Sequence, residues 1–292
     1  MSWWDEFANR TELDAPIGRM TWFRLGGRGR YLVRPRDADD LAAVVCRARE
    51  AGVPVKVLGA GANVLVRDDG FDGVVVRLDQ PAFRRIRREG TNVRVGGGVD
   101  LMPLVKSLSY EGLAGLECLA GIPGTIGGAV RMNAGGPAGS IGDRVREADV
   151  LAPAGHVETW DRDRLGFGYR HSALGEAIVL SAWLELVEDD PRESRARFDA
   201  ALARKVAAQP LADRSAGCMF KNPPGDYAGR LIDQAGLKGM RRGGAAVSTR
   251  HANFIVADKD ATAGDVLDLM ESIRDTVRDR FGVELEPEVD IW

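Results

Sequence analysis

The stretch Gly121-Ile-Pro-Gly-Thr-Ile-Gly-Gly128 lies in the most glycine-rich part of a chain of 292 residues. Ten of the 36 glycines fall between Gly112 and Gly142, where an even distribution would place about four. Glycine adopts positive φ without steric cost and lets the backbone approach another group closely. The concentration of glycine therefore indicates loops that contact a ligand or form tight turns.

A second glycine-rich site, Gly59-Ala-Gly-Ala-Asn63, follows directly after an apolar strand expected at residues 53–58. Both sites can present backbone N–H groups to a phosphate, with Thr125 and Asn63 adding side-chain donors. Val64 stands where a dinucleotide fingerprint needs its third glycine, and the sequence has no nucleoside-triphosphate loop. Tight turns remain the alternative for either site alone, but two such sites favour a shared pyrophosphate.

The composition is that of a globular protein. Hydrophobic residues make up 45% of the chain, and 40 Lys and Arg against 43 Asp and Glu give a net charge of −3, with no basic field for nucleic acid or an anionic membrane. Three scattered cysteines, Cys46, Cys118 and Cys218, favour a reducing compartment. The sequence shows no signal peptide and no apolar run long enough to span a bilayer, so we expect a cytoplasmic protein.

Hydrophobic periodicity predicts an α+β protein. Helical spacing occurs in residues 37–52, 101–112, 192–209, 226–236 and 262–281, and strand patterns occur in residues 53–58, 64–66, 73–78, 92–95, 177–187 and 253–257, with a hairpin over 148–160. The final helix carries Val266, Met270, Ile273 and Val277 on one face. That apolar stripe predicts packing against a small sheet.

The chain length and a charged linker at Glu188 to Pro191 predict two domains. We place the first at residues 1–190, with two lobes over about 20–78 and 79–190, and the second at residues 191–292.

Candidates for chemistry are few. The three histidines show no zinc-binding spacing, and no nucleophile elbow is present. Arg170 is of a type that holds a carboxylate bidentately, and Cys218 carries a thiol that can donate a proton. Taken singly, such residues are more often a surface ion pair, a small buried hydrophobe or, for Glu288, a solvated carboxylate.

Together these segments resemble one family closely, the UDP-N-acetylenolpyruvoylglucosamine reductases (MurB). The match includes Gly121 to Gly128, Phe167-Gly-Tyr-Arg-His-Ser172, Ala216-Gly-Cys-Met-Phe-Lys-Asn-Pro223 and Leu285-Glu-Pro-Glu-Val289. It also covers residues 21–27, 58–66, 70–73, 115–120, 132–135, 228–232, 235–239 and 251–255, and so extends over nearly the whole chain.

The resemblance implies an FAD-binding domain of the vanillyl-alcohol-oxidase type, followed by a smaller α+β substrate-binding domain. It further implies that FAD is bound without a covalent link, that NADPH reduces it, and that UDP-N-acetylglucosamine enolpyruvate is reduced to UDP-N-acetylmuramate, a peptidoglycan precursor. The residues expected to hold FAD are Gly59, Ala60, Gly61, Ala62, Asn63, Val64, Gly121, Ile122, Pro123, Gly124, Thr125, Gly127 and Gly128.

The family's catalytic residues map onto three positions. Arg170 is expected to stabilise negative charge that develops on the substrate carboxylate. Glu288 matches the acidic residue that supports this cation or relays a proton, and Cys218 occupies the place of the proton donor. Tyr169, Lys221 and Asn222 are expected to contact substrate phosphates or NADPH.

Several positions depart from the family pattern. Cys218 stands where serine is more frequent, and a thiol is far more acidic than an alcohol. Ala62 replaces a common serine, and Asp290 replaces a frequent basic residue. The short connection from Glu188 to Arg195 has no room for a tyrosine-bearing substrate loop, which is typical of the shorter subclass.

Two other functions stay open at this point. One is an FAD oxidoreductase of the same fold that acts on another alcohol or sugar, and the other is a flavin or nucleotide-sugar binding protein without turnover. For the reductase we expect small-molecule partners only, a monomer and no bound metal.

Overall fold

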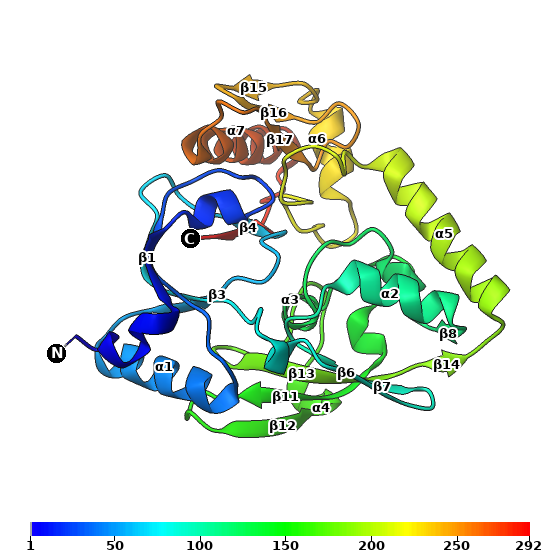
Figure 1. Cartoon of the computed structure of the whole chain (residues 1–292). Helices are drawn as coiled ribbons and strands as arrows, with labels where there is room; N and C mark the ends of the chain where they lie inside the picture. The colour runs from blue at the N-terminus through cyan, green and yellow to red at the C-terminus, as the bar shows by residue number, and fades with distance from the viewer. Residues whose placement is uncertain (1) are drawn as a thin grey trace. The chain divides into compact units, whose positions relative to one another are not determined.

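The computed structural model describes residues 2–292, which fold into two compact units of mixed helix and strand. Unit 1 contains the described residues up to Leu13, together with Tyr31–Ala60 and Asp72–Lys205. Unit 2 contains Asp14–Arg30, Gly61–Phe71 and Val206–Trp292. Figure 1 shows the chain coloured by residue number, so that the three pieces of each unit can be followed.

The first sheet of unit 1 has four strands in the order β1 (Thr11–Ala15), β2 (Gly29–Val33), β5 (Phe71–Val76) and β3 (Val55–Val57). β3 and β5 are parallel, with Val55 opposite Val74. The crossover between β2 and β3 is α1 (Ala38–Glu50), whose N-cap Asp37 accepts a hydrogen bond from the N–H of Asp40. The apolar face of α1 is buried in one core with this sheet, as its helical spacing predicts.

The second sheet of unit 1 is antiparallel throughout. Its strand order is β12 (Val157–Asp161), β11 (Val145–Leu151), β13 (Ile178–Glu185), β7 (Asn92–Gly96) and β6 (Ile86–Glu89). α2 (Leu101–Tyr110) and α3 (Ile126–Arg131) share one hydrophobic core with it. The short α4 (Arg162–Leu165) follows β12, and β8 (Leu113–Ala114) pairs with β14 (Val187–Glu188). The glycine-rich segment 121–128 ends within α3, which begins at Ile126.

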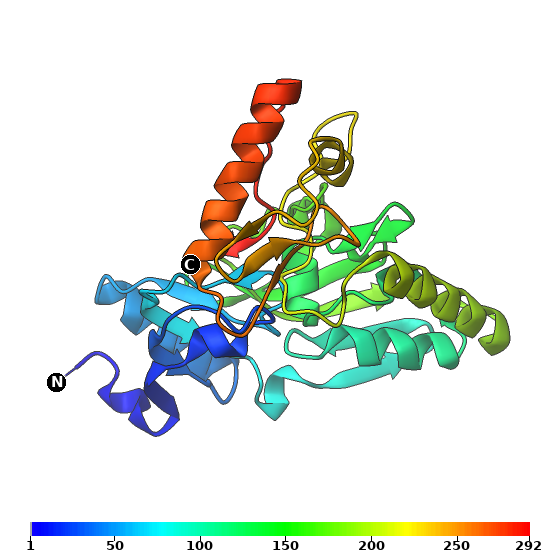
Figure 2. The ribbon, with the colours of Figure 1, turned by 90° about the horizontal axis from the view of Figure 1, so that it is seen from above.

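Unit 2 contains a three-stranded antiparallel sheet, β15 (Arg241–Arg242), β16 (Ala245–Val247) and β17 (Ile255–Ala257). α7 (Ala263–Phe281) packs its apolar stripe against this sheet, which confirms the prediction, and Figure 2 shows the helix beside the strands. α6 (Ala228–Gln234) joins the same core. β4 (Val64–Leu65) pairs in parallel with β18 (Asp290–Ile291), so that residues far apart in sequence become neighbours.

The predicted helices and longer strands are present, but the units do not divide at residue 190. They divide within α5 (Pro191–Ala208), after Lys205, because Phe198 of that helix is 1% exposed in the core of unit 1. Two early segments, Asp14–Arg30 and Gly61–Phe71, belong to unit 2, where Phe23 and Leu65 are buried in its core. The predicted domains, residues 1–190 and 191–292, are those of the family. The two compact units do not test them, so these limits stay a prediction.

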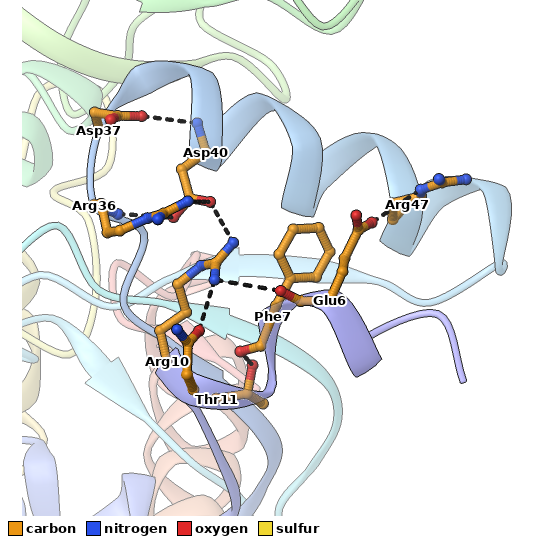
Figure 3. Close-up of polar contacts among 9 residues, drawn as sticks. Glu6, Phe7, Arg10, Thr11, Arg36, Asp37, Asp40 and Arg47 are labelled. Carbon is orange, nitrogen blue, oxygen red and sulfur yellow. Dashed lines mark hydrogen bonds and ion pairs between the residues drawn. The ribbon is translucent and has the colours of Figure 1, made fainter. Parts of the chain in front are cut away.

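A buried ion pair fastens α1 to the N-terminal segment of unit 1. Asp40, whose side chain is 4% exposed, accepts hydrogen bonds from Arg10 Nη2 at 2.5 Å and from Arg36 Nη2 at 3.1 Å (Figure 3). Burial alone would raise the pKa of Asp40, but hydrogen bonds from Arg36 and Arg10 outweigh it and hold the pKa below its usual value. The carboxylate therefore stabilises the fold in its ionised form.

We expect Asp40→Asn to lower the free energy of unfolding at pH 7 by about 3 kcal/mol, because it removes one partner of a buried ion pair. The native pKa lies below the unfolded value near ~3.9, so the contribution is complete above that pH and declines as the pH falls below it. The difference in free energy of unfolding between wild type and Asp40→Asn should therefore shrink as the pH falls. Urea unfolding followed by circular dichroism between pH 7 and about 3.5 measures it.

Asp39→Asn provides the matched control, since Asp39 is the exposed neighbour in the same turn of α1. Its effect should stay within about 0.5 kcal/mol. Equal stability of Asp40→Asn and wild type at pH 7, or a difference that does not change with pH, would contradict this role of Asp40.

Candidate functional site

A pocket in unit 1 is formed where glycine-rich turns from different parts of the unit meet. Both glycine sites found in the sequence contribute, and so do β3, the segment after β5, the turn after β7 and the beginning of β13. The pocket is lined by Val57, Leu58, Gly59, Ala60, Arg77, Leu78, Asp79, Arg84, Gly97, Gly98, Asp100, Thr125, Gly127, Gly128, Arg131, Ile178 and Val179.

The turns pack so closely that side chains would not fit. A Cβ on Gly59 would lie 2.6 Å from Oγ1 of Thr125, and a Cβ on Gly98 would lie 1.8 Å from the carbonyl oxygen of Leu78. The carbonyl of Gly97 accepts a hydrogen bond from the N–H of Gly127 at 2.8 Å. Three glycine sites thus form one backbone-lined wall.

The remaining walls of the pocket combine apolar and charged side chains. Ile178 and Val179 are buried at the beginning of β13. Arg84 pairs with Asp100 at 2.7 Å. Nε of Arg77 is buried and lies 3.6 Å from Oδ2 of Asp79, too far for a hydrogen bond, and it has no hydrogen-bond partner among residues 2–292.

This lining fits a dinucleotide such as FAD. The glycine wall allows close approach of phosphate groups, apolar residues suit a flat ring, and the buried Nε of Arg77 is a donor that a bound acceptor would satisfy. Thr125 is the N-cap of α3, and its Oγ1 accepts from the N–H of Gly128 at 3.4 Å. Its hydroxyl can still donate to a ligand.

The predicted cofactor residues fall into three groups. Gly59, Ala60, Thr125, Gly127 and Gly128 line the pocket. Gly121, Ile122, Pro123 and Gly124 precede it without lining it, and a Cβ on Gly121 would lie 3.1 Å from Cδ of Lys205 in α5. Gly61, Ala62, Asn63 and Val64 belong to unit 2.

The charged and apolar lining residues were not predicted from the sequence, and neither were Gly97 and Gly98. The run Gly96-Gly97-Gly98 directly after the strand at 92–95 is the signal that could have found the third glycine site. The charged residues give no such signal, because arginine and aspartate are frequent throughout this chain.

Arg170 and Tyr169 lie in a tight turn of unit 1. Gly168 and His171 exchange backbone hydrogen bonds at 3.0 and 3.2 Å, and the buried Asn133 donates its Nδ2 to the carbonyl of Gly168 at 2.8 Å. Arg170 has φ of 51°, and its Nη1 donates to the carbonyl of Gly135 at 2.9 Å. A non-glycine residue held at positive φ is typical of a functional turn. Asn133 was not given a role from the sequence.

Cys218 and Glu288 lie on neighbouring extended segments of unit 2. The N–H of Glu288 donates to the carbonyl of Met219 at 2.8 Å. On the other side of Met219, buried Asn253 accepts from the N–H of Phe220 at 3.0 Å and donates Nδ2 to its carbonyl at 2.8 Å. We call residues 218–221, 253–254 and 286–288 the Met219 frame. It joins the backbones of two predicted catalytic residues.

Lys221 and Asn222 continue from this frame. Nζ of Lys221 pairs with Glu286 at 2.5 Å, and the N–H of Lys221 donates to the carbonyl of Glu286 at 2.8 Å. Oδ1 of Asn222 accepts from the N–H of Ala228 at the beginning of α6, at 3.1 Å. The ammonium of Lys221 is therefore paired with the exposed carboxylate of Glu286.

Asp290 also has a defined place in unit 2. Its carboxylate accepts from Nε1 of Trp292 at 2.8 Å, and its N–H donates to the carbonyl of Asn63 at 3.0 Å. The aspartate at this position thus orients the C-terminal tryptophan.

Two further titratable groups, one in each unit, have pKa values that burial shifts. Burial lowers the pKa of His251, whose ring contacts that of Phe254 edge-on with centroids 4.9 Å apart, so the imidazole is neutral near pH 7. Burial raises the pKa of the Cys118 thiol, which lies shortly before the glycine-rich segment 121–128 in the chain. The Cys118 thiol is therefore protonated and the His251 imidazole uncharged near neutral pH.

Residues 2–292 lack two other kinds of feature. No helix combines the length and the apolar character that crossing a bilayer requires. No group of histidine, cysteine, aspartate and glutamate residues has a metal-binding arrangement in that part of the chain.

Comparison with protein families gives two matches. Residues 209–292 match the C-terminal domain of UDP-N-acetylenolpyruvoylglucosamine reductase, and residues 30–161 match an FAD binding domain. The second match includes every lining residue of the pocket up to Arg131.

Individual relatives agree with this result. UDP-N-acetylenolpyruvoylglucosamine reductase of Moorella thermoacetica is 44% identical over 95% of this chain and 91% of its own length. The second such reductase of Symbiobacterium thermophilum is 46% identical over 95% of this chain and 90% of its own length.

Solved structures extend the comparison. The reductase of Thermus caldophilus, 37% identical, superposes with a TM-score of 0.84 over 97% of this chain and 99% of its own. A berberine-bridge-enzyme-like protein of Physcomitrella patens shares the fold over 64% of this chain and 45% of its own, with 21% identity and a TM-score of 0.50. The chain therefore belongs to the UDP-N-acetylenolpyruvoylglucosamine reductase family, whose members are flavin-dependent oxidoreductases (UDP-N-acetylmuramate dehydrogenases).

Proposed function

We propose that this protein reduces UDP-N-acetylglucosamine enolpyruvate to UDP-N-acetylmuramate with NADPH as the electron source, as one step of peptidoglycan precursor synthesis. A hydride and a proton add across the carbon–carbon double bond of the enolpyruvyl group, and NADPH becomes NADP⁺. The observation that carries the proposal is the Met219 frame, in which the segments of Cys218 and Glu288 are hydrogen-bonded to each other.

FAD is the cofactor that the pocket in unit 1 is proposed to hold without a covalent bond. Gly59, Ala60, Thr125, Gly127 and Gly128 would contact its pyrophosphate. The chemistry that FAD supplies when bound is transfer of a hydride, taken from NADPH, to the terminal vinyl carbon of the substrate.

Arg170 is proposed to bind the substrate carboxylate. Hydride addition at the vinyl carbon moves negative charge towards that carboxylate, and a cation fixed beforehand stabilises this charge. The hydrogen bond to Gly135 and the turn held by Asn133 fix the side chain before substrate binds. Fixed orientation avoids the energetic cost of reorganisation during the reaction.

Cys218 is proposed to donate the proton to the carbon next to the carboxylate. A thiol is far more acidic than an alcohol and can release its proton to a carbanion-like centre. Glu288, on the adjoining segment, is proposed to assist this transfer by supporting charge or returning a proton to the site.

Tyr169, Lys221 and Asn222 are proposed to bind the anionic parts of the substrate or NADPH. The ring of Tyr169 is 56% exposed, and the guanidinium of Arg170 lies 5.4 Å from its centroid, so the two can recognise a ligand together. We further propose a monomer that acts in the cytoplasm.

The purified protein should be yellow, and NADPH should bleach the visible absorbance of the flavin under anaerobic conditions. Addition of UDP-N-acetylglucosamine enolpyruvate should then restore the colour with formation of one product per flavin. Stopped-flow absorbance and mass spectrometry of the product measure both steps.

Each failure of that experiment has its own meaning. Bleaching without recovery would contradict the proposed substrate and favour another FAD oxidoreductase of this fold. Colour that NADPH does not bleach would favour a binding protein without turnover. A protein that stays colourless after reconstitution with FAD would contradict the pocket assignment.

Replacement of Cys218 should separate proton donation from flavin reduction. Cys218→Ala should slow reoxidation of the flavin by about 10²-fold or more, because it removes the proton donor, while NADPH should reduce the flavin at the wild-type rate. Cys218→Ser should keep substantial activity, since a hydroxyl can donate the same proton. Single-turnover kinetics of the two half-reactions test this.

Cys46→Ala is the matched control, because Cys46 is exposed on α1 of unit 1. It should reoxidise at the wild-type rate. Near-normal turnover of Cys218→Ala would remove Cys218 from the mechanism.

A further inference from the structure

Asn63 makes a contact that its place in a glycine loop does not predict. The sequence suggests a side-chain donor for a phosphate, but Nδ2 of Asn63 donates to the carbonyl oxygen of Glu288 at 3.0 Å. The backbone carbonyl of Asn63 accepts from the N–H of Asp290 at 3.0 Å. One asparagine therefore holds the chain on both sides of Val289.

These two hydrogen bonds begin the short parallel ladder of unit 2. Val64 lies opposite Asp290, and Leu65 lies opposite Ile291. The side chain of Asn63 extends this ladder by one step beyond the regular strand. It reaches Glu288, which lies outside β18.

Glu288 is thus held through both of its backbone polar groups. Its N–H is bonded to Met219 in the Met219 frame, and its carbonyl is bonded to Asn63. On the far side of Met219, Asn253 is 3% exposed and fastens Phe220 through two hydrogen bonds. Asn253 fixes the segment that carries Cys218, and Asn63 fixes the segment that carries Glu288.

We propose that Asn63 is a positioning residue for Glu288 and thereby controls the rate of the protonation step. This inference rests on the proposed function, in which Glu288 assists Cys218. A single side-chain hydrogen bond contributes only about 1 kcal/mol to stability, so its loss leaves the fold intact. A small displacement of a catalytic group, by contrast, lowers a rate by as much as about 10²-fold.

The same geometry links cofactor loop and catalytic segment. Asn63 stands at the end of the glycine loop that begins with Gly59, and its amide acts on a residue 225 positions later. The carboxamide is needed for this role as a donor, since the atom that it meets is a carbonyl oxygen. A carboxylate at this position would place two acceptors against each other.

The first test compares half-reactions of the FAD-loaded enzyme. Asn63→Ala should be reduced by NADPH at the wild-type rate, but its reoxidation by the enolpyruvyl substrate should be slower by about 10-fold to 10²-fold at saturating substrate. Asn63→Asp should be at least as slow, because it cannot donate. Asn92→Ala, the same change at the beginning of β7, should match the wild type.

The second test asks whether Asn63 acts through Glu288. In a double-mutant cycle, Asn63→Ala combined with Glu288→Gln should reoxidise no more slowly than Glu288→Gln alone. A multiplicative loss in the double variant would overturn the inference, as would wild-type reoxidation of Asn63→Ala. Slow reduction by NADPH in Asn63→Ala would also overturn it, because the effect would then lie in cofactor binding.

Hydrogen–deuterium exchange provides a readout that does not depend on turnover. Amides of residues 286–290 should exchange faster in Asn63→Ala than in wild type or Asn92→Ala, and unchanged protection would contradict the inference. A Glu288→Gln enzyme with wild-type reoxidation would instead show that the proposed role of Glu288 fails, and the role of Asn63 with it. Exchange in Asn63→Ala thus tests the contact between Asn63 and the segment of Glu288, and reoxidation of Glu288→Gln tests the proposed role of Glu288.

Discussion

The hydrogen bond from Glu288 to Met219 is the constraint on which the proposed chemistry of unit 2 depends. It joins the C-terminal segment to the segment that carries Cys218 and Lys221. Among residues 2–292 neither segment belongs to a long strand that would fix it by itself, since residues 218 and 220 pair with Phe254 and Pro287 through isolated bridges. Side chains of Asn253 and Asn63 therefore supply hydrogen bonds that a regular sheet would take from the backbone.

Unit 1 depends on a different constraint, the close approach of three glycine sites. Gly59, Gly97 and Gly127 each face backbone or a short side chain at distances that exclude a Cβ or leave it no freedom. The wall that results is rich in peptide groups and poor in side chains. Such a surface suits phosphate, because it offers N–H donors without steric obstruction.

Much of the fold follows from local sequence patterns. The faces of α1 and α7 are predicted by apolar spacing, and the β11–β12 hairpin by its Pro153-Ala-Gly155 turn. β6 was not predicted, because its four residues are all exposed and three of them are charged, so that it shows no hydrophobic alternation. α3 was not predicted either, because Gly127 and Gly128 disfavour a helix. Tertiary hydrogen bonds of the glycine wall nevertheless stabilise this helix.

The candidate site was predictable only in part. Ordered motifs indicated both glycine loops and the positions of Arg170, Cys218 and Glu288. Sequence alone did not indicate that the loop 59–64 is shared between two compact units, because this follows from the pairing of β4 with β18 at the other end of the chain. The partner of the Asn63 amide was hidden for the same reason, since a local pattern carries no information on contacts 225 residues away.

The central claim is that Cys218 and Glu288 act as one unit when the substrate is protonated. The most direct measurement compares the reoxidation rates of Cys218→Ala, Glu288→Gln and the double variant, each loaded with FAD and reduced beforehand. Groups that act together are non-additive, so the double variant should be about as slow as the slower single variant. Losses that multiply in the double variant would show that the two residues act independently and would contradict the account.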